Sequence, residues 1–387
     1  MTAALVKGWC PGAWRPMQSG DGLLVRIRPR GGRLDPRQAA GLAELAARHG
    51  NGLIDVTIRA NLQVRGVSEQ SHPALIEGLA ELGLLDPDPE SEARRNVLVT
   101  PFWRAGDGIY PLACELEQAL TAASFDLPAK FGFAVDCGAQ RLLAGSSADI
   151  RIERAATGGL IVRADGAPLG LPVARQEAVE GALKLAEWFA ADGGAAGGRG
   201  RMAAHLGSGA KLPGGLAGAI KPAGVAPLPG PALCEAGAIV GAAFGQLDHA
   251  ALRCLAESAN GLRVTPWRMI LAEAMTEMPH HAGLVTDARD PILRVVACSG
   301  APACQSAHAD TRSLAARLAP QLAPGARLHV SGCAKGCAHR GAQSVTLVAT
   351  SQGFDLIRDG SPQAAPVLRG LSIERMLHEP SLLMGAR

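Results

Sequence analysis

Four cysteines toward the C-terminal end constrain the fold of this chain more than any other feature. They form two pairs, Cys298 with Cys304 in CSGAPAC and Cys333 with Cys337 in GCAKGCA. The stretch between the pairs is long enough for one helix, so all four thiolates can converge on a single iron–sulfur cube. The spacing therefore predicts a 4Fe-4S site built from two loops that meet in space.

Small residues beside the thiols suit such a site. Gly300, Pro302, Gly332 and Gly336 lie where the backbone must turn tightly and present amide groups to sulfur without hindrance from a Cβ atom. A structural zinc is an alternative, although its pairs usually range from C-x2-C to C-x4-C. Scattered buried thiols are the simplest alternative. We expect the remaining cysteines to be structural or incidental: Cys10, Cys114, Cys137, Cys234 and Cys254.

Composition excludes several classes of protein. With 387 residues the chain can form two or three domains. Its net charge is only +3, its basic residues do not cluster, and aromatic residues make up 3%, which argues against nucleic acid as a partner. The N-terminal segment has no uninterrupted apolar run, and the odd cysteine count favours a reducing compartment. We therefore expect a cytoplasmic protein without a membrane span.

The second informative stretch is LIDVTIRANLQVRG at 53–66. Its apolar and polar residues alternate strictly, which predicts one continuous strand. The apolar face would hold Ile54, Val56, Ile58, Ala60, Leu62 and Val64. The polar face would hold Asp55, Thr57, Arg59, Asn61, Gln63 and Arg65. A surface strand with a solvated face gives the same pattern, but this row of side chains would also suit an anionic ligand.

The pattern repeats later in the chain, which indicates an internal duplication. GRLD at 32–35 returns as GQLD at 245–248, and LAARHGNGLIDVTIRANL is echoed by LAESANGLRVTPWRMIL. In the second copy Pro266 interrupts the alternation, and Arg268 stands near the position of Arg59. The first copy predicts a helix over 36–48, because Asp35 and Pro36 are typical of a helix start.

The rest of the chain mixes helices and strands. Glycine, alanine and proline dominate 193–231, which we interpret as including a linker. Other expected elements are strands within 23–28, 94–103 and 127–138, a hairpin at 148–166, helices at 111–123, 175–191 and 306–318, and strands ending at 330 and spanning 343–350.

These features together resemble the siroheme-dependent sulfite and nitrite reductase superfamily. The resemblance implies an α+β fold with two ferredoxin-like half domains and two α/β catalytic domains around a central tetrapyrrole pocket. The implied division is 15–80 for the first half domain, 90–192 for the first α/β domain, 193–231 for the linker region, 232–285 for the second half domain, and 290–387 for the α/β domain with the cysteines.

Four separated motifs are similar to one branch, the precorrin-3B synthase family of aerobic cobalamin biosynthesis: SGDGLLVRIRP, TIRANLQVRG, LRVTPWR and GCAKGCAH. Members hydroxylate precorrin-3A with dioxygen and form a lactone. The reductases carry a second lysine two positions after the one that corresponds to Lys130, whereas this chain has Gly132. Loss of that cation lowers the support for the alternative, a siroheme-dependent assimilatory sulfite or nitrite reductase.

The resemblance also implies a set of site residues. Arg59, Arg95 and Lys130 fall on anion- and tetrapyrrole-binding positions, and Cys337 is the cysteine nearest the ring. Because guanidinium groups grip carboxylates in bidentate fashion, arginines suit the acetate and propionate groups of a precorrin. The further candidates for binding are Asn61, Gln63 and Arg65, with Arg26 and Arg28 as more distant possibilities.

Cofactors and partners follow from the same resemblance. A 4Fe-4S cluster would carry electrons, and the pocket would hold siroheme, a mononuclear iron or only the substrate, with His308 and His339 as candidate iron ligands or proton donors. A dinucleotide fingerprint is missing from the sequence, so electrons from NADH would arrive through a partner reductase or ferredoxin. A non-enzymatic electron-transfer or assembly subunit is the remaining alternative.

Overall fold

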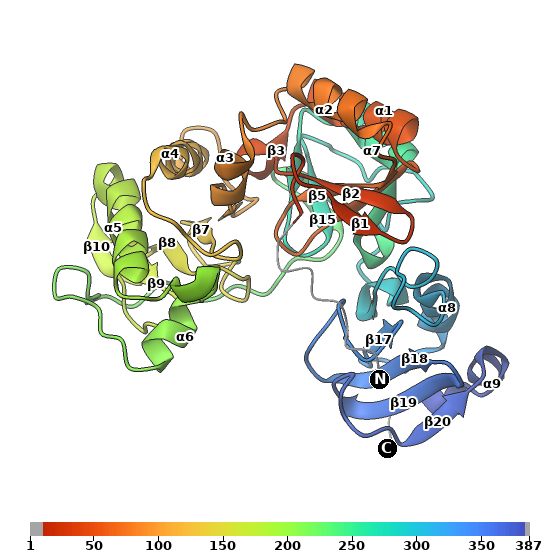
Figure 1. The fold of residues 1–387 in the computed structure, drawn as a ribbon. Helices are drawn as coiled ribbons and strands as arrows, with labels where there is room; N and C mark the ends of the chain where they lie inside the picture. The colour runs from red at the N-terminus through yellow and green to blue at the C-terminus, as the bar shows by residue number, and fades with distance from the viewer. Residues whose placement is uncertain (1–10, 384–387) are drawn as a thin grey trace.

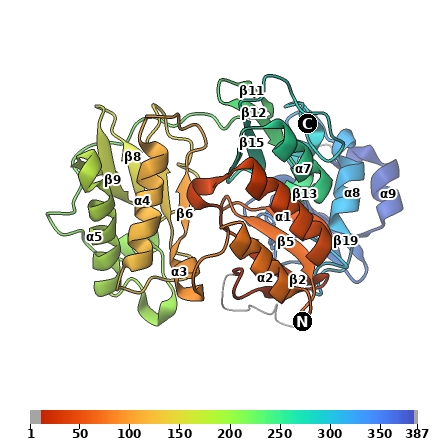
Figure 2. The same ribbon diagram turned by 90° about the horizontal axis from the view of Figure 1, so that it is seen from above.

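The computed structural model describes residues 11–383, and the strands of these residues form four five-stranded sheets. Two sheets form a central body with α1, α2 and α7, and each of the other two belongs to an α/β domain on one side of it (Figure 1). Figure 2 shows α4 and α5 at one end, α8 and α9 at the other, and α1 with α7 between them. Cys10 lies outside the described residues. Within 11–383 no helix is long and apolar enough to cross a membrane.

The central sheets have the same order, β1-β2-β5-β4-β13 and β11-β12-β15-β14-β3. Their strands are β1 (Met17–Ser19), β2 (Gly22–Ile27), β3 (Arg33–Leu34), β4 (Leu53–Val56), β5 (Leu62–Val67), β11 (Ala232–Cys234), β12 (Gly237–Gly241), β13 (Gln246–Asp248), β14 (Leu262–Val264) and β15 (Met269–Glu273). Each sheet takes its last strand from the other copy, because β13 pairs with β4 and β3 pairs with β14. The predicted duplication is confirmed, and its two copies are interlocked.

Helix α1 (Pro36–His49) shows why the local prediction succeeded. Asp35 accepts a hydrogen bond from the Gln38 amide, and the Gln38 side chain accepts one from the Asp35 amide, which forms a capping box. The second copy repeats the design in α7 (His249–Ser258), where Asp248 caps the first turn. The two helices pack on each other. The second helix of the first copy is α2 (His72–Glu81).

The prediction of one strand over 53–66 is wrong, because a tight turn divides it into β4 and β5. The Thr57 hydroxyl accepts hydrogen bonds from the amides of Arg59 and Asn61 at 3.3 and 3.1 Å, and Ala60 takes a left-handed φ of 52°. The turn leaves Ile58 59% exposed. Local side-chain hydrogen bonding of this kind competes with strand continuation, although the alternation does not reveal it.

The two α/β domains share one topology, three parallel strands followed by two antiparallel ones. The first contains α3 (Pro89–Arg94), β6 (Val97–Val99), α4 (Ile109–Ala122), β7 (Phe133–Asp136), β8 (Ile150–Arg154), β9 (Leu160–Ala164), β10 (Leu171–Val173) and α5 (Ala178–Ala191). The second contains β16 (Val295–Ala297), α8 (Thr311–Leu318), β17 (Leu328–Ser331), β18 (Gln343–Thr350), β19 (Gly353–Gly360), β20 (Leu368–Leu371) and α9 (Ile373–His378).

Short 3-10 helices complete the element list: Arg30–Gly32, Arg175–Glu177, Ala196–Gly198, Ala243–Gly245, Pro291–Arg294, Ala319–Gln321 and Pro380–Leu383. The segment 193–231 contains α6 (Met202–Gly207), and Met202 is fully buried in the core of the first α/β domain. The amide of Ala223 donates to the carbonyl of Arg154 at 2.9 Å. Much of the expected linker therefore packs on this domain.

Candidate functional site

The four cysteines lie at the carboxyl ends of two parallel strands. Cys298 directly follows β16, and Cys333 comes two residues after β17. Parallel neighbours end at the same edge of a sheet, so the loops that carry Cys304 and Cys337 start side by side. The β16–α8–β17 crossover thus brings the two cysteine pairs, which are far apart in the sequence, to one edge of the sheet.

The other three cysteines of the two pairs are electrostatic neighbours of Cys337. Burial raises the pKa of Cys337; Lys335 lowers it, and Cys298, Cys333 and Cys304 raise it further. No three His, Cys, Asp or Glu side chains within 11–383 converge tightly enough to hold a single metal ion.

The backbone around the thiols has the form of a cradle. The Gly332 amide donates to Sγ of Cys298 at 3.2 Å, and a Cβ atom on Gly332 would lie 2.6 Å from the Cβ of Ala307. Gly300 and Gly336 adopt left-handed φ values of 65° and 61°. Amides aimed at sulfur and loops that exclude side chains are what cluster ligation requires, so the residues present fit a 4Fe-4S cluster.

The polar face of the first central sheet contacts the cysteine domain. The carboxylate of Asp55 accepts from Arg65 at 2.8 Å, from Gln246 of the second copy at 3.0 Å and from Arg312 of α8 at 3.3 Å. The Ser19 hydroxyl donates to the carbonyl of Ala303, beside Cys304, at 2.7 Å. This face therefore lies against the cysteine loops and is not a solvated surface.

Several predicted binding residues have internal partners. The buried Arg65 donates to both carboxylate oxygens of Asp21 at 2.9 Å, in addition to its bond to Asp55. With its amide oxygen turned toward Arg26, Gln63 accepts from that guanidinium at 2.8 and 3.1 Å. The amide nitrogen of Asn61 is buried and has no hydrogen-bond partner among the described residues. Asn61 is thus the member of this group with an unsatisfied donor.

Arg59 and Lys130 come together across two domains. Arg59 lies in the turn between β4 and β5, and its Nη2 donates to the carbonyl of Lys130 at 3.0 Å. Lys130 precedes β7 and is exposed. The structure thus joins two predicted anion-binding residues and leaves the Lys130 ammonium exposed to solvent.

Arg95 lies in a buried ion network. It is 3% exposed, donates to Asp86 at 2.9 and 2.8 Å and to the carbonyl of Arg28 at 2.7 Å, and lies 3.5 Å from Glu117. Arg28 itself pairs with Glu92 at 3.0 Å. Burial raises the pKa of Glu117, and the positive charge of Arg95 acts in the opposite direction. These contacts hold the first half domain on the first α/β domain.

The second copy contributes residues that were not among the predicted site residues. Arg268 occupies a left-handed position, φ 63°, between β14 and β15, and donates to the carbonyl of Ala338, next to Cys337, at 3.3 Å. Burial, and then the charge of Arg312, lowers its pKa. The alignment of the two repeats, which sets Arg268 near the position of Arg59, is the sequence signal that could have identified Arg268 as a site residue.

Two histidines lie on the same side of the cysteine domain. His329 is fully buried, and neither ring nitrogen has a partner among the described residues. Its ring lies 6.1 Å from that of His339, and burial, His339 and Arg268 lower its pKa to about 4. His339 contacts Gln343 at 2.7 Å, whereas the side chain of His308 is exposed.

Comparison with known proteins defines the class first. The model of the nitrite/sulfite reductase ferredoxin-like half domain matches residues 15–82. The structure of Mycobacterium tuberculosis NirA superposes with a TM-score of 0.55 at 15% identity, over 92% of this chain and 79% of that chain. A ferredoxin–nitrite reductase of Synechococcus elongatus is 30% identical over 141 residues, 34% of this chain and 27% of that protein. The fold is that of the nitrite and sulfite reductases.

A longer match is more specific. A precorrin-3B synthase of a Sinorhizobium species is 30% identical over 412 aligned residues, which span 94% of this chain and 85% of the relative. The chain belongs to the precorrin-3B synthase family.

Proposed function

We propose that this protein is an oxidoreductase of cobalamin biosynthesis that hydroxylates precorrin-3A with dioxygen and forms the lactone of precorrin-3B. The observation that carries the proposal is the match to a precorrin-3B synthase along 94% of the chain. The cysteine edge and the cationic residues near it are compatible with a tetrapyrrole carboxylic acid and a reduced cofactor.

The four cysteines at the ends of β16 and β17 would hold the cluster: Cys298, Cys304, Cys333 and Cys337. When bound, a 4Fe-4S cluster supplies electrons one at a time. Gly332 stabilises the thiolate of Cys298 through its amide, and Arg268 fixes the backbone immediately after Cys337. Electrons that originate from NADH would arrive through a partner reductase or ferredoxin.

Arg59 and Lys130 are the cations that we assign to the substrate. Precorrins carry acetate and propionate groups around their ring, and an arginine binds such a carboxylate through two parallel hydrogen bonds. Arg95 and Arg65 already pair with internal carboxylates, so we assign them to holding the site together. In this assignment Arg59 and Lys130 bind and orient the ring, and residues of the second copy support the cysteine loop.

Gly132 favours oxygenation over reduction of a small oxyanion. It is buried, its amide donates to Asp149 at 3.0 Å, and a Cβ atom there would lie 3.1 Å from the carbonyl of Asn96. The position thus carries no second lysine for sulfite or nitrite, and a long side chain would have to displace its neighbours. Siroheme or a mononuclear iron in addition to the cluster is compatible with this assignment.

Turnover of defined variants tests the proposal. The protein, reconstituted anaerobically with iron and sulfide, is given precorrin-3A, a reductant and dioxygen, and product formation is followed by mass. We expect Arg59→Ala to raise KM by about tenfold or more, since a charged hydrogen bond is worth about 1.5–3 kcal/mol. Arg253→Ala, an exposed arginine of α7, is the matched control. Reduction of sulfite or nitrite without any oxygenated product would favour the reductase alternative.

A non-enzymatic electron-transfer or assembly role makes a different forecast. In that case Arg59→Ala would leave the pathway unaffected, whereas Cys333→Ser would still remove the low-temperature spin signal of the reduced cluster.

A further inference from the structure

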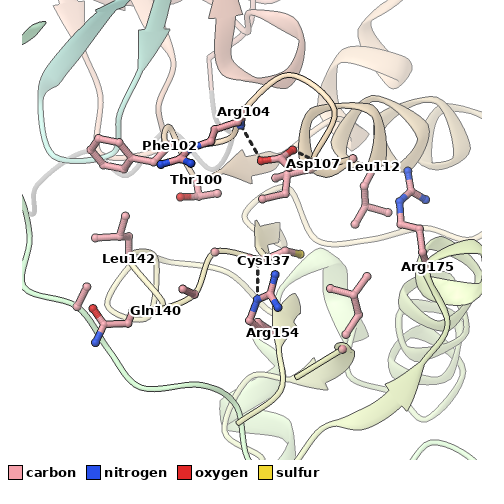
Figure 3. Close-up of a pocket in the computed structure, with 17 residues that line it drawn as sticks. Thr100, Phe102, Arg104, Asp107, Leu112, Cys137, Gln140, Leu142, Arg154 and Arg175 are labelled. Atoms are coloured by element: carbon pink, nitrogen blue, oxygen red, sulfur yellow. Dashed lines mark hydrogen bonds between the residues drawn. The ribbon is translucent and has the colours of Figure 1, made fainter. Parts of the chain in front are cut away.

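A cavity of about 750 Å3 lies in the first α/β domain, and none of the four cysteines of the proposed cluster site lines it. Thr100 follows β6, Cys137 follows β7, and Arg154 is the last residue of β8, so the cavity opens at the carboxyl ends of three parallel strands (Figure 3). Ligands of α/β folds bind preferentially at this edge, and the volume is typical of a small-molecule site.

The cavity corresponds to the cysteine edge of the second α/β domain. Both domains have the same strand order and directions, so the loop after β6 corresponds to the loop after β16, and the loop after β7 to the loop after β17. Cys137 is buried, and burial raises its pKa to about 12, so its thiol stays protonated. A protonated thiol is a poor metal ligand and nucleophile, so this edge lacks the thiolate chemistry proposed for the cysteine edge of the second domain.

The lining combines apolar walls with charged side chains, among which three arginines outnumber one carboxylate, that of Asp107. Apolar side chains come from the loops after the strands, from α4 and from β9: Phe102, Ile109, Leu112, Leu142 and Leu160. Three guanidinium groups also line it, those of Arg104, Arg154 and Arg175 (Figure 3). A ligand that fits has an apolar body and a negative charge.

The three arginines differ in their partners. Arg175 binds Glu115 through two hydrogen bonds of 2.9 Å, and Arg104 pairs with Glu235. Arg154 uses only its Nε, which donates to the carbonyl of Cys137 at 3.2 Å, and no carboxylate within residues 11–383 forms an ion pair with it. The terminal nitrogens of Arg154 are therefore open donors at the cavity.

We propose that this cavity is a second ligand site, which binds an organic carboxylate with an apolar body through Arg154. The apolar walls take up the body and Arg154 grips the carboxylate, while the ion pairs of Arg104 and Arg175 keep the rim in place. The inference is independent of the oxygenase assignment. The carboxylate can belong to a small aromatic acid or to a tetrapyrrole, which carries the same chemistry on a larger ring.

A fluorescence titration of the full chain tests the site, with 1-naphthoate, uncharged 1-naphthamide and coproporphyrin as probes. We expect naphthoate to bind and naphthamide to bind at least tenfold more weakly. Arg154→Ala and Arg154→Gln should each weaken naphthoate binding by about tenfold to a hundredfold, which corresponds to one charged hydrogen-bonding contact. Arg154→Gln keeps a donor for the Cys137 carbonyl, so it separates loss of charge from loss of local structure.

A control variant locates the binding. Arg317→Ala, an exposed arginine of α8, should leave the affinities for naphthoate and coproporphyrin unchanged. Coproporphyrin binding that needs Arg154 would identify a tetrapyrrole as the source of the carboxylate; naphthoate binding alone would identify a small acid. Equal binding of naphthoate and naphthamide, or affinities that both Arg154 variants leave unchanged, would overturn the proposal. Failure of precorrin turnover would not bear on it.

Discussion

Replacing Arg95 separates an internal role from a role in substrate binding. Arg95→Ala removes hydrogen bonds to Asp86 and to the Arg28 carbonyl, and leaves Glu117 buried without a cation at 3.5 Å. Breaking a buried ion pair by deleting one partner typically costs 3–5 kcal/mol. Since Arg30 still reaches Asp86 at 3.3 Å, we expect the free energy of unfolding to fall by about 3 kcal/mol, near the lower end of this range.

Urea denaturation followed by circular dichroism measures this loss as a fall in midpoint at constant slope. Arg59→Ala, in a turn, should change the stability by less than about 0.5 kcal/mol while impairing turnover. In the double variant Asp86→Ala/Arg95→Ala the two losses should not add, because one interaction is counted in both. If Arg95→Ala kept the wild-type midpoint and lost only turnover, the buried-network account of Arg95 would be refuted.

Three further perturbations test other parts of the structure. Burial raises the pKa of Asp136 to about 6, above its unfolded value near 3.9, so folding stability that is present at pH 4 is lost as pH rises through 6. The unfolding free energy of Asp136→Asn should therefore rise by about 2–3 kcal/mol relative to that of the wild type between pH 4 and pH 8. A difference that does not depend on pH would contradict the shift. The guanidinium of Arg263 stacks 3.5 Å from the centre of the Trp103 ring and donates to the Trp103 carbonyl at 2.6 Å. Arg263→Ala should therefore lower the free energy of unfolding by about 2 kcal/mol and speed amide hydrogen exchange at 102–104. Unchanged exchange would count against this contact. Gly332→Ala should lower the iron bound on reconstitution severalfold, measured against Gly325→Ala in an open turn, whereas equal iron content would mean that the cradle tolerates a side chain.

Features set by local chemistry were predictable from the sequence. The Asp35–Pro36 start and the apolar stripe of α1 depend on neighbours within a few residues, and the cysteine spacing needs only one crossover to bring the thiols together. The duplication was also visible, because two copies of one motif keep similar capping and turn residues. What the repeat did not show is that β3 and β13 exchange between the copies, since strand pairing is a long-range contact.

The partners of the arginines could not be predicted. Arg59 and Arg95 both belong to motifs that indicate anion binding, yet Arg95 meets Asp86, nine residues earlier, inside the core, and Arg59 meets the backbone of a different domain. The strand prediction over 53–66 failed for a related reason. The Thr57 hydroxyl closes a turn that strict alternation hides, and this turn is what places Arg59 at the end of the hairpin.

Isotope transfer tests the central proposal most directly. The reconstituted protein is incubated with precorrin-3A and a reductant under dioxygen that carries heavy oxygen in ordinary water, and the product is analysed by mass. We expect the tetrapyrrole to gain one heavy oxygen atom, in a reaction that Cys333→Ser abolishes and Arg253→Ala leaves intact. A tetrapyrrole that gains no label while the same preparation reduces sulfite or nitrite would contradict the assignment.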